Sequence, residues 1–253
     1  MRYVLTISYD GTDYAGWQRQ KNALSVQEKL EEAVEKALNK RLHVTASGRT
    51  DAGVHAAGQV CHFDGESITV PPEKMPDCLN RFLPSDIRVI DGWGADDGFD
   101  ANRSAKRKTY CYSLYVSSRE LPLIDRYCVR IDSAPTLEIL QKKAKLLEGE
   151  HDYKAFCASG SAVKTTVRTV YEVRVEESAA YGCRVIKIFV TGNGFLYNMV
   201  RTMTGELLDL ASDRRTEDSL MQAYETGQRE LLGKTMPAKG LTLIQVEYET
   251  PQS

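Results

Sequence analysis

The alternation of apolar and polar residues predicts a first series of six elements in the N-terminal part of the chain. Apolar residues recur at helical spacing after Ser25, and Ser25 with Glu28 forms the S-x-x-E pattern of a helix N-terminus. The series comprises a strand at 2–9, a helix from 25, strands at 42–47 and 54–63, a helix containing Leu79, Phe82 and Leu83, and a strand at 87–91. The predicted order is β-α-β-β-α-β.

A second series repeats this order after residue 104. Tyr110, Tyr112, Leu114 and Val116 alternate along 108–116 and should share one face of a strand. Thr136 precedes the next apolar repeat at helical spacing. The remaining predicted elements are strands at 167–177 and 184–191, helices at 197–211 and from 217, and a strand at 241–248.

Two β-α-β-β-α-β series predict an α+β protein made of two ferredoxin-like units. We expect the units to comprise residues 1–103 and 104–253. Each unit would have helices on one face of its sheet. The open faces would form a largely antiparallel platform with a central active-site cleft. Such a platform suits an extended ligand such as RNA, but the fold alone does not define a function.

The composition is that of an ordinary soluble globular protein, because 42% of the residues are hydrophobic and 27% are charged. No apolar run approaches the roughly 18 residues of a membrane span. The N-terminus lacks the layout of a signal peptide. The six cysteines contain no CxxC pair, which favours reduced thiols over disulfides or a zinc site. We therefore expect a cytoplasmic protein that does not bind a membrane.

The net charge of −2 does not by itself indicate nucleic-acid binding. Residues 103–108, RSAKRK, nevertheless carry four positive charges in six positions. A run of this kind is either a solvated loop or a local contact for phosphates, whose affinity would fall with salt.

The clearest candidate for chemistry is the segment 47–60, SGRTDAGVHAAGQV, in which Arg49 and Asp51 stand among small residues. In an extended segment the two side chains share a face, and the guanidinium favours an ionised carboxylate. Such a carboxylate can act as a nucleophile, and the neighbouring glycines would let a bulky ligand approach. The ordinary explanation is a surface turn in which Asp51 bonds its own backbone.

Motifs for cofactors are missing from the sequence. It contains no phosphate-binding GxxxxGK[ST] loop, no HExxH helix and no GxSxG elbow, and its four histidines do not have metal-ligand spacing. If the protein is an enzyme, we expect it to work without a metal or an organic cofactor. Its reactive group would then be a side chain, with a carboxylate as the leading candidate.

The string SGRTDAGVHA resembles the signature of the TruA-type tRNA pseudouridine synthases. Five further blocks are similar to segments of this family in the same order. They are YDGTDYAGWQRQ (9–20), LNRFLPSDIRV (79–89), SAKRKTYCY (104–112), GNGFLYNMVR (192–201) and MPAKGLTLIQVEY (236–248). One departure is Asn102, which stands where the family often has arginine, with Arg103 beside it.

The resemblance implies an enzyme that detaches uracil from its ribose, turns it and rejoins it through carbon 5 without a cofactor. It implies that Asp51 is the catalytic aspartate, attacking either the base or the ribose. Arg49 would help to flip the target nucleotide, and Tyr110 would stack on the extruded uracil and could take part in proton transfer. Arg201 would pair with the catalytic carboxylate.

The resemblance also implies partners. The substrate would be tRNA, at uridines 38 to 40 of the anticodon stem-loop, and the enzyme would act as a homodimer. Close relatives with other RNA targets could carry the same motifs. The basic run would contact RNA through Arg103, Lys106, Arg107 and Lys108. His55 would be a structural or RNA-contacting histidine.

Two other functions remain open from the residues alone. A nucleosidase or glycosidase could use Asp51, although such hydrolases usually employ two carboxylates and the matching motifs offer no second acid. A catalytically idle RNA-binding module is the other alternative. In either case Tyr110 could be a core tyrosine and Arg201 an exposed residue of its helix.

Overall fold

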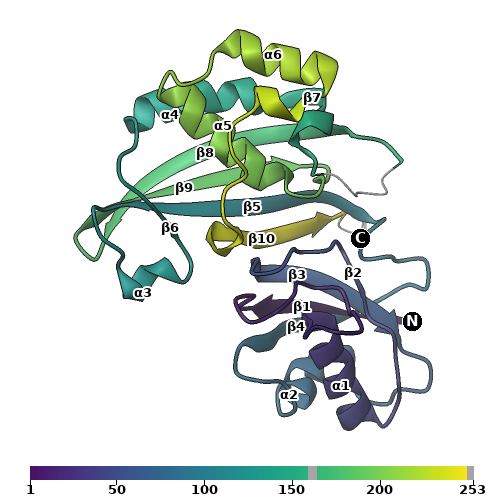
Figure 1. Ribbon diagram of the computed structural model, residues 1–253. Helices are drawn as coiled ribbons and strands as arrows, with labels where there is room; N and C mark the ends of the chain where they lie inside the picture. Colours follow the sequence, from purple (N-terminus) through teal and green to yellow (C-terminus); the bar gives the residue numbers. More distant parts are fainter. Residues whose placement is uncertain (159–163, 250–253) are drawn as a thin grey trace. The chain divides into compact units, whose positions relative to one another are not determined.

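The computed structural model describes residues 1–158 and 164–249. Its contacts divide the chain into two units, which we describe separately (Figure 1). Unit 1 comprises Met1–Lys106 together with the C-terminal segment that begins at Thr242, and unit 2 comprises Arg107–Leu241. Both units combine helices with a mostly antiparallel sheet, which confirms the predicted α+β class.

Unit 1 has the predicted order of elements. They are β1 (Arg2–Tyr9), α1 (Val26–Leu38), β2 (Thr45–Ala46), β3 (His55–Asp64), α2 (Met75–Leu79), β4 (Ile87–Ala95) and the C-terminal β10 (Leu241–Tyr248). Strand β1 lies between β4 and β3 and is antiparallel to both. The other edge of β3 pairs with β2 at one end and, in parallel, with β10 at the other.

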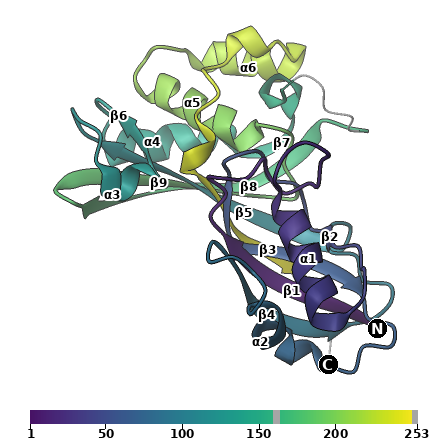
Figure 2. The same cartoon turned by 60° about the horizontal axis from the view of Figure 1, so that its bottom comes forward.

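Helix α1 covers one face of this sheet, as Figure 2 shows. Its apolar residues Val26, Leu30, Ala33 and Val34 are at most 1% exposed, as the helical repeat predicted. Ser25 caps the helix, because its side chain accepts a hydrogen bond from the backbone N–H of Glu28. The spacing and the cap together explain why this segment forms a helix here.

Strand β10 belongs to unit 1 by its contacts, whereas the sequence division at residue 103 counted it with the second half. The hydroxyl of Tyr248 donates to the carbonyl of Ala101 over 2.7 Å, and its ring centroid lies 5.0 Å from that of Phe99. Gly58 of β3 makes room for the strand, since a Cβ there would lie 2.5 Å from the carbonyl oxygen of Ile244.

Unit 2 contains β5 (Ala105–Val116, from Arg107 onward), α3 (Pro122–Asp125), β6 (Val129–Ile131), α4 (Leu137–Ala144), β7 (Gly149–Asp152), β8 (Val167–Ala180), β9 (Cys183–Gly192), α5 (Met199–Ala211) and α6 (Glu217–Thr226). The antiparallel strands are ordered β5-β9-β8-β7, and β6 pairs in parallel with β5. Strands β6 and β7 and helix α3 were not predicted.

Strand β5 lies in the hydrophobic core of unit 2, because residues from both of its faces are buried. Tyr112 and Leu114 from one face and Tyr115 from the other are all 0% exposed. Figure 1 shows α4 and α5 over one face of the sheet, and the side chain of Thr136 caps α4, the helix predicted to start there. In the part of the chain that the structure describes, no helix is long and apolar enough to cross a membrane.

Candidate active site

Asp51 lies half-buried in the loop between β2 and β3. The backbone N–H of Val54 donates to the carbonyl of Asp51 over 3.1 Å, and Gly53 has a φ of 76°. The segment is therefore a turn, which was the ordinary explanation for its sequence. What distinguishes it from a surface turn is how firmly the rest of unit 1 holds it.

The loop at residues 10–17 is hydrogen-bonded to this turn. The backbone N–H of Trp17 donates to the carbonyl of Thr50 over 3.0 Å, and the N–H of Gly53 donates to the carbonyl of Tyr14 over 3.3 Å. The hydroxyl of Thr50 is 2.8 Å from the hydroxyl of Tyr9 in a buried contact. Bonds on either side of Asp51 thus fix the backbone that carries its carboxylate.

Two glycines allow this loop to pack directly on the turn. A Cβ at Gly11 would lie 2.0 Å from the carbonyl oxygen of Val54. A Cβ at Gly16, whose φ is +93°, would lie 2.5 Å from the carbonyl oxygen of Thr50. Gly11 and Gly16 of the 9–20 block therefore serve the close approach of this loop to the backbone at Thr50 and Val54.

Polar side chains hold the start of β3 and the approach to the turn. His55 is 3% exposed, and its Nδ1 accepts from the backbone N–H of Gly11 over 3.0 Å. Ser47 donates to Oε1 of Gln59 over 2.6 Å, and Nε2 of Gln59 donates to the carbonyl of Gly48 over 2.9 Å. His55 is thus a buried, hydrogen-bonded residue rather than one presented at the surface.

Arg49 is exposed in the same loop. Its Nε donates to Oε1 of Gln18 over 3.0 Å. Gln18 lies in the block at residues 9–20, but nothing in the sequence singled it out as a partner of Arg49. Unit 1 thus brings Arg49 and Asp51 together in one loop and holds that loop with the 10–18 segment.

Tyr110 lies on β5 of unit 2, opposite Val190 of β9, and is 8% exposed. The ring of Phe195 meets it edge-on, with centroids 5.3 Å apart and an interplanar angle of 89°. Phe195 was not predicted as a site residue. Its place in the GNGFLYNMVR block is the signal that could have indicated it.

Arg201 lies in the first turn of α5, and its guanidinium donates to the side chain of Asn198 and to the carbonyl of Met236. Nε donates to the carbonyl of Met236 and Nη1 donates to Oδ1 of Asn198, each over 2.6 Å. Asn198 precedes the helix with a φ of 63°, a left-handed conformation that asparagine tolerates better than most residues. Arg201 is therefore an oriented, half-buried group rather than a simple exposed helix residue.

The segment before β10 runs along α5 and fixes this helix. The hydroxyls of Thr202 and Thr235 are 3.1 Å apart, and the backbone N–H of Gly233 donates to Oε2 of Glu206 over 2.6 Å. A Cβ at Gly205 would lie 1.9 Å from the carbonyl oxygen of Lys234. These contacts lie beside the two C-terminal blocks that carried the resemblance, and the blocks themselves meet at Arg201 and Met236.

The charge of Arg201 also affects a tyrosine on the face of β5 that carries Tyr110. Burial raises the pKa of Tyr112, and the positive charge of Arg201 opposes this rise. Because Tyr110 and Tyr112 are two residues apart on one strand, they share a face. Unit 2 thus places its two predicted site residues, Tyr110 and Arg201, toward the same side of its sheet.

The first part of the basic run lies in unit 1. Arg103 is exposed at a turn in which Oδ1 of Asp100 accepts from the backbone N–H groups of Asn102 and Arg103, both over 2.9 Å. Lys106 forms an ion pair of 2.8 Å with Glu249. Asn102, the departure from the family pattern, thus has its backbone held by the carboxylate of this turn.

The second part of the run lies in unit 2. The guanidinium of Arg107 is 5.0 Å from the ring centroid of Tyr171, a cation–π contact. Lys108 is half-buried, and burial together with the charge of Arg168 lowers its pKa to about 8. The run is therefore not one uniform solvated patch. Among residues 1–158 and 164–249, no three His, Cys, Asp or Glu side chains are grouped as metal ligands.

A family described as "tRNA pseudouridine synthase" matches residues 5–92 and 144–249. The chain belongs to this tRNA pseudouridine synthase family. Its membership confirms the resemblance and identifies an enzyme family, the isomerases that act on RNA. The matched residues include Arg49, Asp51 and Arg201, whereas Tyr110 lies between the two matched stretches.

Individual tRNA pseudouridine synthases match over nearly the full chain. The protein named tRNA pseudouridine synthase A from Thermoanaerobacter sp. (strain X514) is 39% identical over 245 residues, covering 97% of this chain and 98% of the relative. That from Bacillus subtilis (strain 168) is 40% identical over 252 residues, covering 98% and 100%. That from Syntrophotalea carbinolica is 41% identical over 249 residues, covering 96% and 95%.

Proposed function

We propose that this chain isomerises uridine to pseudouridine in tRNA, at positions 38 to 40 of the anticodon stem-loop. The observation that carries the proposal is the Asp51 turn, which the 10–17 loop holds through backbone bonds in a member of the tRNA pseudouridine synthase family. A carboxylate held in this way loses little freedom on meeting a substrate, which favours its use as a reacting group.

In the proposed reaction, the target nucleotide leaves the RNA stack and its uracil reaches Asp51. Attack by the Asp51 carboxylate on the flipped nucleotide frees the uracil from carbon 1′ of the ribose. The uracil turns and its carbon 5 forms the new bond to that ribose carbon. The bond between Asp51 and the nucleotide breaks, which returns the free carboxylate. Carbon 5 then loses its hydrogen as a proton, and nitrogen 1 gains one, so that the product has the mass of the substrate.

The other predicted residues have supporting roles in this proposal. Arg49 enters the stack in place of the extruded uridine, and Tyr110 stacks on the uracil, a contact worth about 1–3 kcal/mol. Arg201 pairs with the Asp51 carboxylate and keeps it ionised. Arg103, Lys106, Arg107 and Lys108 contact RNA phosphates. By the same resemblance, the active form is a homodimer, which sedimentation velocity with and without tRNA would test.

The deciding experiment is tritium release from tRNA labelled at carbon 5 of uridine. We expect the wild-type chain to release tritium and Asp51→Ala to slow release by at least about a thousandfold. Asp97→Ala is the control, since it removes an exposed carboxylate from the same unit. Transcripts with cytidine at position 38, 39 or 40 identify the target.

Each other outcome has a distinct meaning. Free uracil as a product would indicate a nucleosidase, because hydrolysis removes the base. Tight tRNA binding without tritium release would indicate an RNA-binding module. Tritium release that persists in Asp51→Ala would show that Asp51 is not the catalytic residue. The protein would still be a pseudouridine synthase.

A further inference from the structure

We propose that Gln18 and Gln27 are positioning residues for Arg49, with Glu31 as their anchor. The inference rests on the proposed function, in which Arg49 takes the place of the flipped uridine. It concerns how an exposed arginine is held ready before the RNA arrives.

The network begins at Arg49, which forms a hydrogen bond with Gln18. Its Nε donates to Oε1 of Gln18 over 3.0 Å. This bond uses one of the five guanidinium donors, so the terminal nitrogens are not consumed by it. A surface arginine would otherwise lose rotamer entropy when it enters a defined site. Fixing the guanidinium at Nε removes part of that loss in advance.

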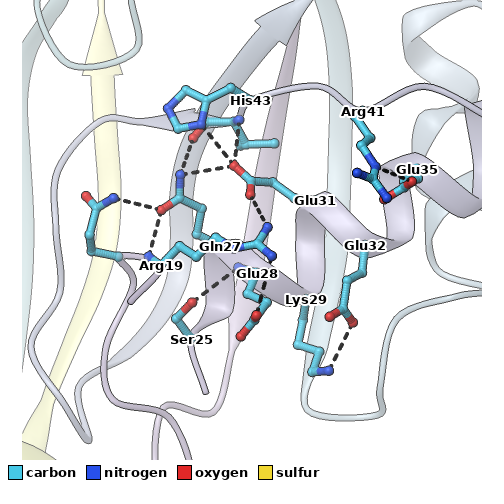
Figure 3. Close-up of polar contacts among 12 residues, drawn as sticks. Arg19, Ser25, Gln27, Glu28, Lys29, Glu31, Glu32, Glu35, Arg41 and His43 are labelled. Atoms are coloured by element: carbon cyan, nitrogen blue, oxygen red, sulfur yellow. Dashed lines mark hydrogen bonds and ion pairs between the residues drawn. The ribbon is translucent and has the colours of Figure 1, made fainter. Parts of the chain in front are cut away.

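The chain of amides continues into helix α1. Nε2 of Gln18 donates to Oε1 of Gln27 over 3.0 Å. Gln27 is 2% exposed, and its own Nε2 donates to the carbonyl of Val44 over 3.0 Å and to Oε1 of Glu31 over 3.2 Å. Figure 3 shows the side chains of Gln27 and Glu31, both from α1, close together, with Glu31 one turn further along the helix.

Glu31 is the fixed end of this chain. Its side chain is 11% exposed, and its Oε1 also accepts from the backbone N–H of Val44 over 3.2 Å. Its Oε2 accepts from Arg19 over 2.9 Å, a contact visible in Figure 3. A carboxylate with this many donors has little freedom to rotate, so it gives the network a rigid origin.

The chemistry of the ends sets the orientation of both amides. The ionised carboxylate of Glu31 only accepts, and the guanidinium of Arg49 only donates. Each glutamine must therefore turn its NH₂ group toward Glu31 and its oxygen toward Arg49. Reversing either amide would place two donors or two acceptors face to face. Glu31, two side chains away from Gln18, thus specifies that the Gln18 atom that meets Arg49 is an acceptor.

The competing explanation is that these bonds only attach the loop to α1. Gln27 contributes to that attachment, because its Oε1 also accepts from the backbone N–H of Arg19 over 2.8 Å, so its loss would affect folding as well. Gln18 separates the two explanations. It is exposed, and within the described part of the chain the hydrogen bonds of its side chain go to Gln27 and Arg49.

The test compares Gln18→Met, which keeps the length and removes the amide, with Gln20→Met. Gln20 is the matched control because its Nε2 donates to the carbonyl of Ala15 in the same loop. The first measurement is solvent exchange of the Arg49 Nε hydrogen by ¹⁵N NMR without RNA, with the signal assigned by its loss in Arg49→Lys. We expect exchange to become about tenfold faster in Gln18→Met and to stay unchanged in Gln20→Met.

The second measurement is the single-turnover rate of pseudouridine formation at saturating tRNA. Gln18→Met should slow it about tenfold, while Gln20→Met leaves it unchanged. In an Arg49→Ala background, Gln18→Met should have no further effect, because its influence acts through Arg49. A merely structural role would slow both backgrounds alike.

Unchanged exchange at Arg49, or equal slowing in the two backgrounds, would overturn the positioning role. The failure of the proposed function gives a different pattern: the wild-type chain would release no tritium from tRNA. In that event the exchange measurement, which needs no RNA, still decides whether Gln18 holds Arg49.

Discussion

Asp51 and Arg201 are held by different means. Around Asp51 the bonds run between backbone groups, such as the N–H of Trp17 and the carbonyl of Thr50. Around Arg201 the head group itself is bound, by the side chain of Asn198 and the carbonyl of Met236. Unit 1 thus fixes the position from which a carboxylate projects, whereas unit 2 fixes the orientation of a guanidinium.

This difference follows from side-chain length. An aspartate has two side-chain torsions, so a fixed backbone nearly determines where its oxygens lie. An arginine has a long flexible stem and needs contacts at the guanidinium. We therefore expect unit 1 to be sensitive to added atoms at its glycines, and unit 2 to be sensitive to lost polar partners.

The largest effect is expected for Gly11→Ala. The new methyl group would lie 2.0 Å from the carbonyl oxygen of Val54, a backbone atom that cannot move aside alone. We expect a loss of about 3 kcal/mol in the free energy of unfolding, and a fall in the pseudouridylation rate of more than about a hundredfold. Urea unfolding and single-turnover kinetics measure the two effects.

The control for Gly11→Ala is Gly98→Ala in the same unit. A Cβ at Gly98 would meet no heavy atom within 4 Å. This variant should keep its stability within about 0.5 kcal/mol. Equal effects of the two substitutions would mean that the close approach at Gly11 does not hold the Asp51 turn.

Asn198→Gly tests the other half of the comparison. Glycine keeps the left-handed backbone, at φ 63°, but removes the oxygen that accepts from Arg201. We expect unchanged stability and a rate about tenfold slower, since the guanidinium loses the side-chain oxygen that helps to orient it. Asn198→Ala should add a loss of about 1 kcal/mol in stability, because alanine disfavours this backbone. A rate unaffected by Asn198→Gly would show that the Met236 carbonyl suffices.

Glu206 makes the contacts of unit 2 testable through the pH dependence of stability. Its carboxylate accepts a hydrogen bond from Gly233 and so connects that residue to the helix that carries Arg201. Burial raises the pKa of Glu206, against the hydrogen bond from Gly233 and the charge of Arg215. The folded state therefore holds the proton more tightly than the unfolded state. Stability should fall as the pH rises from the unfolded pKa of about 4.3 through the folded pKa.

Glu206→Gln removes this titration while keeping an oxygen for Gly233. We expect it to raise the free energy of unfolding by about 1 kcal/mol at pH 7 and to flatten its pH dependence above pH 4. Urea unfolding between pH 4 and pH 8 measures both. A variant less stable than the wild type at pH 7 would indicate that the charged form of Glu206 is stabilising.

The smallest effect is expected at Lys108, whose pKa is lowered to about 8. Its charge should be lost as the pH rises above 8, and affinity for tRNA should fall with it. Between pH 7 and pH 9 we expect wild-type affinity to fall about threefold more than that of Lys108→Arg, which stays charged. Fluorescence anisotropy at both pH values compares them. Parallel profiles would exclude Lys108 as a phosphate contact.

The elements with local signals could be predicted from the sequence. Ser25 caps its helix as expected, the helix expected to start at Thr136 is α4, and the predicted strand at 241–248 is β10. Strands β6 and β7, with three and four residues, are too short to show an alternation. The strand expected at 42–47 is reduced to two residues, because only that part of it pairs with β3.

The candidate site was predicted by motif, but not its supporting contacts. Asp51 and Tyr110 stand in recognisable blocks, whereas Gln18 and Phe195 matter only through residues distant in sequence. No local pattern could reveal that Gln18 meets Arg49, 31 positions away. The meeting of Asp51 with Arg201 stays a prediction, which the loss of activity in Arg201→Ala would support.

Strand β10 has a consequence for the order in which the protein is made. On the ribosome, residues 1–106 emerge first, but the strand that pairs with His55 and Ala56 follows only after all of unit 2. The half that carries Asp51 is thus the first to be synthesised and the last to be completed. A nascent chain paused within unit 2 would present an unpaired stretch of β3, which is a template for strand addition by a second molecule.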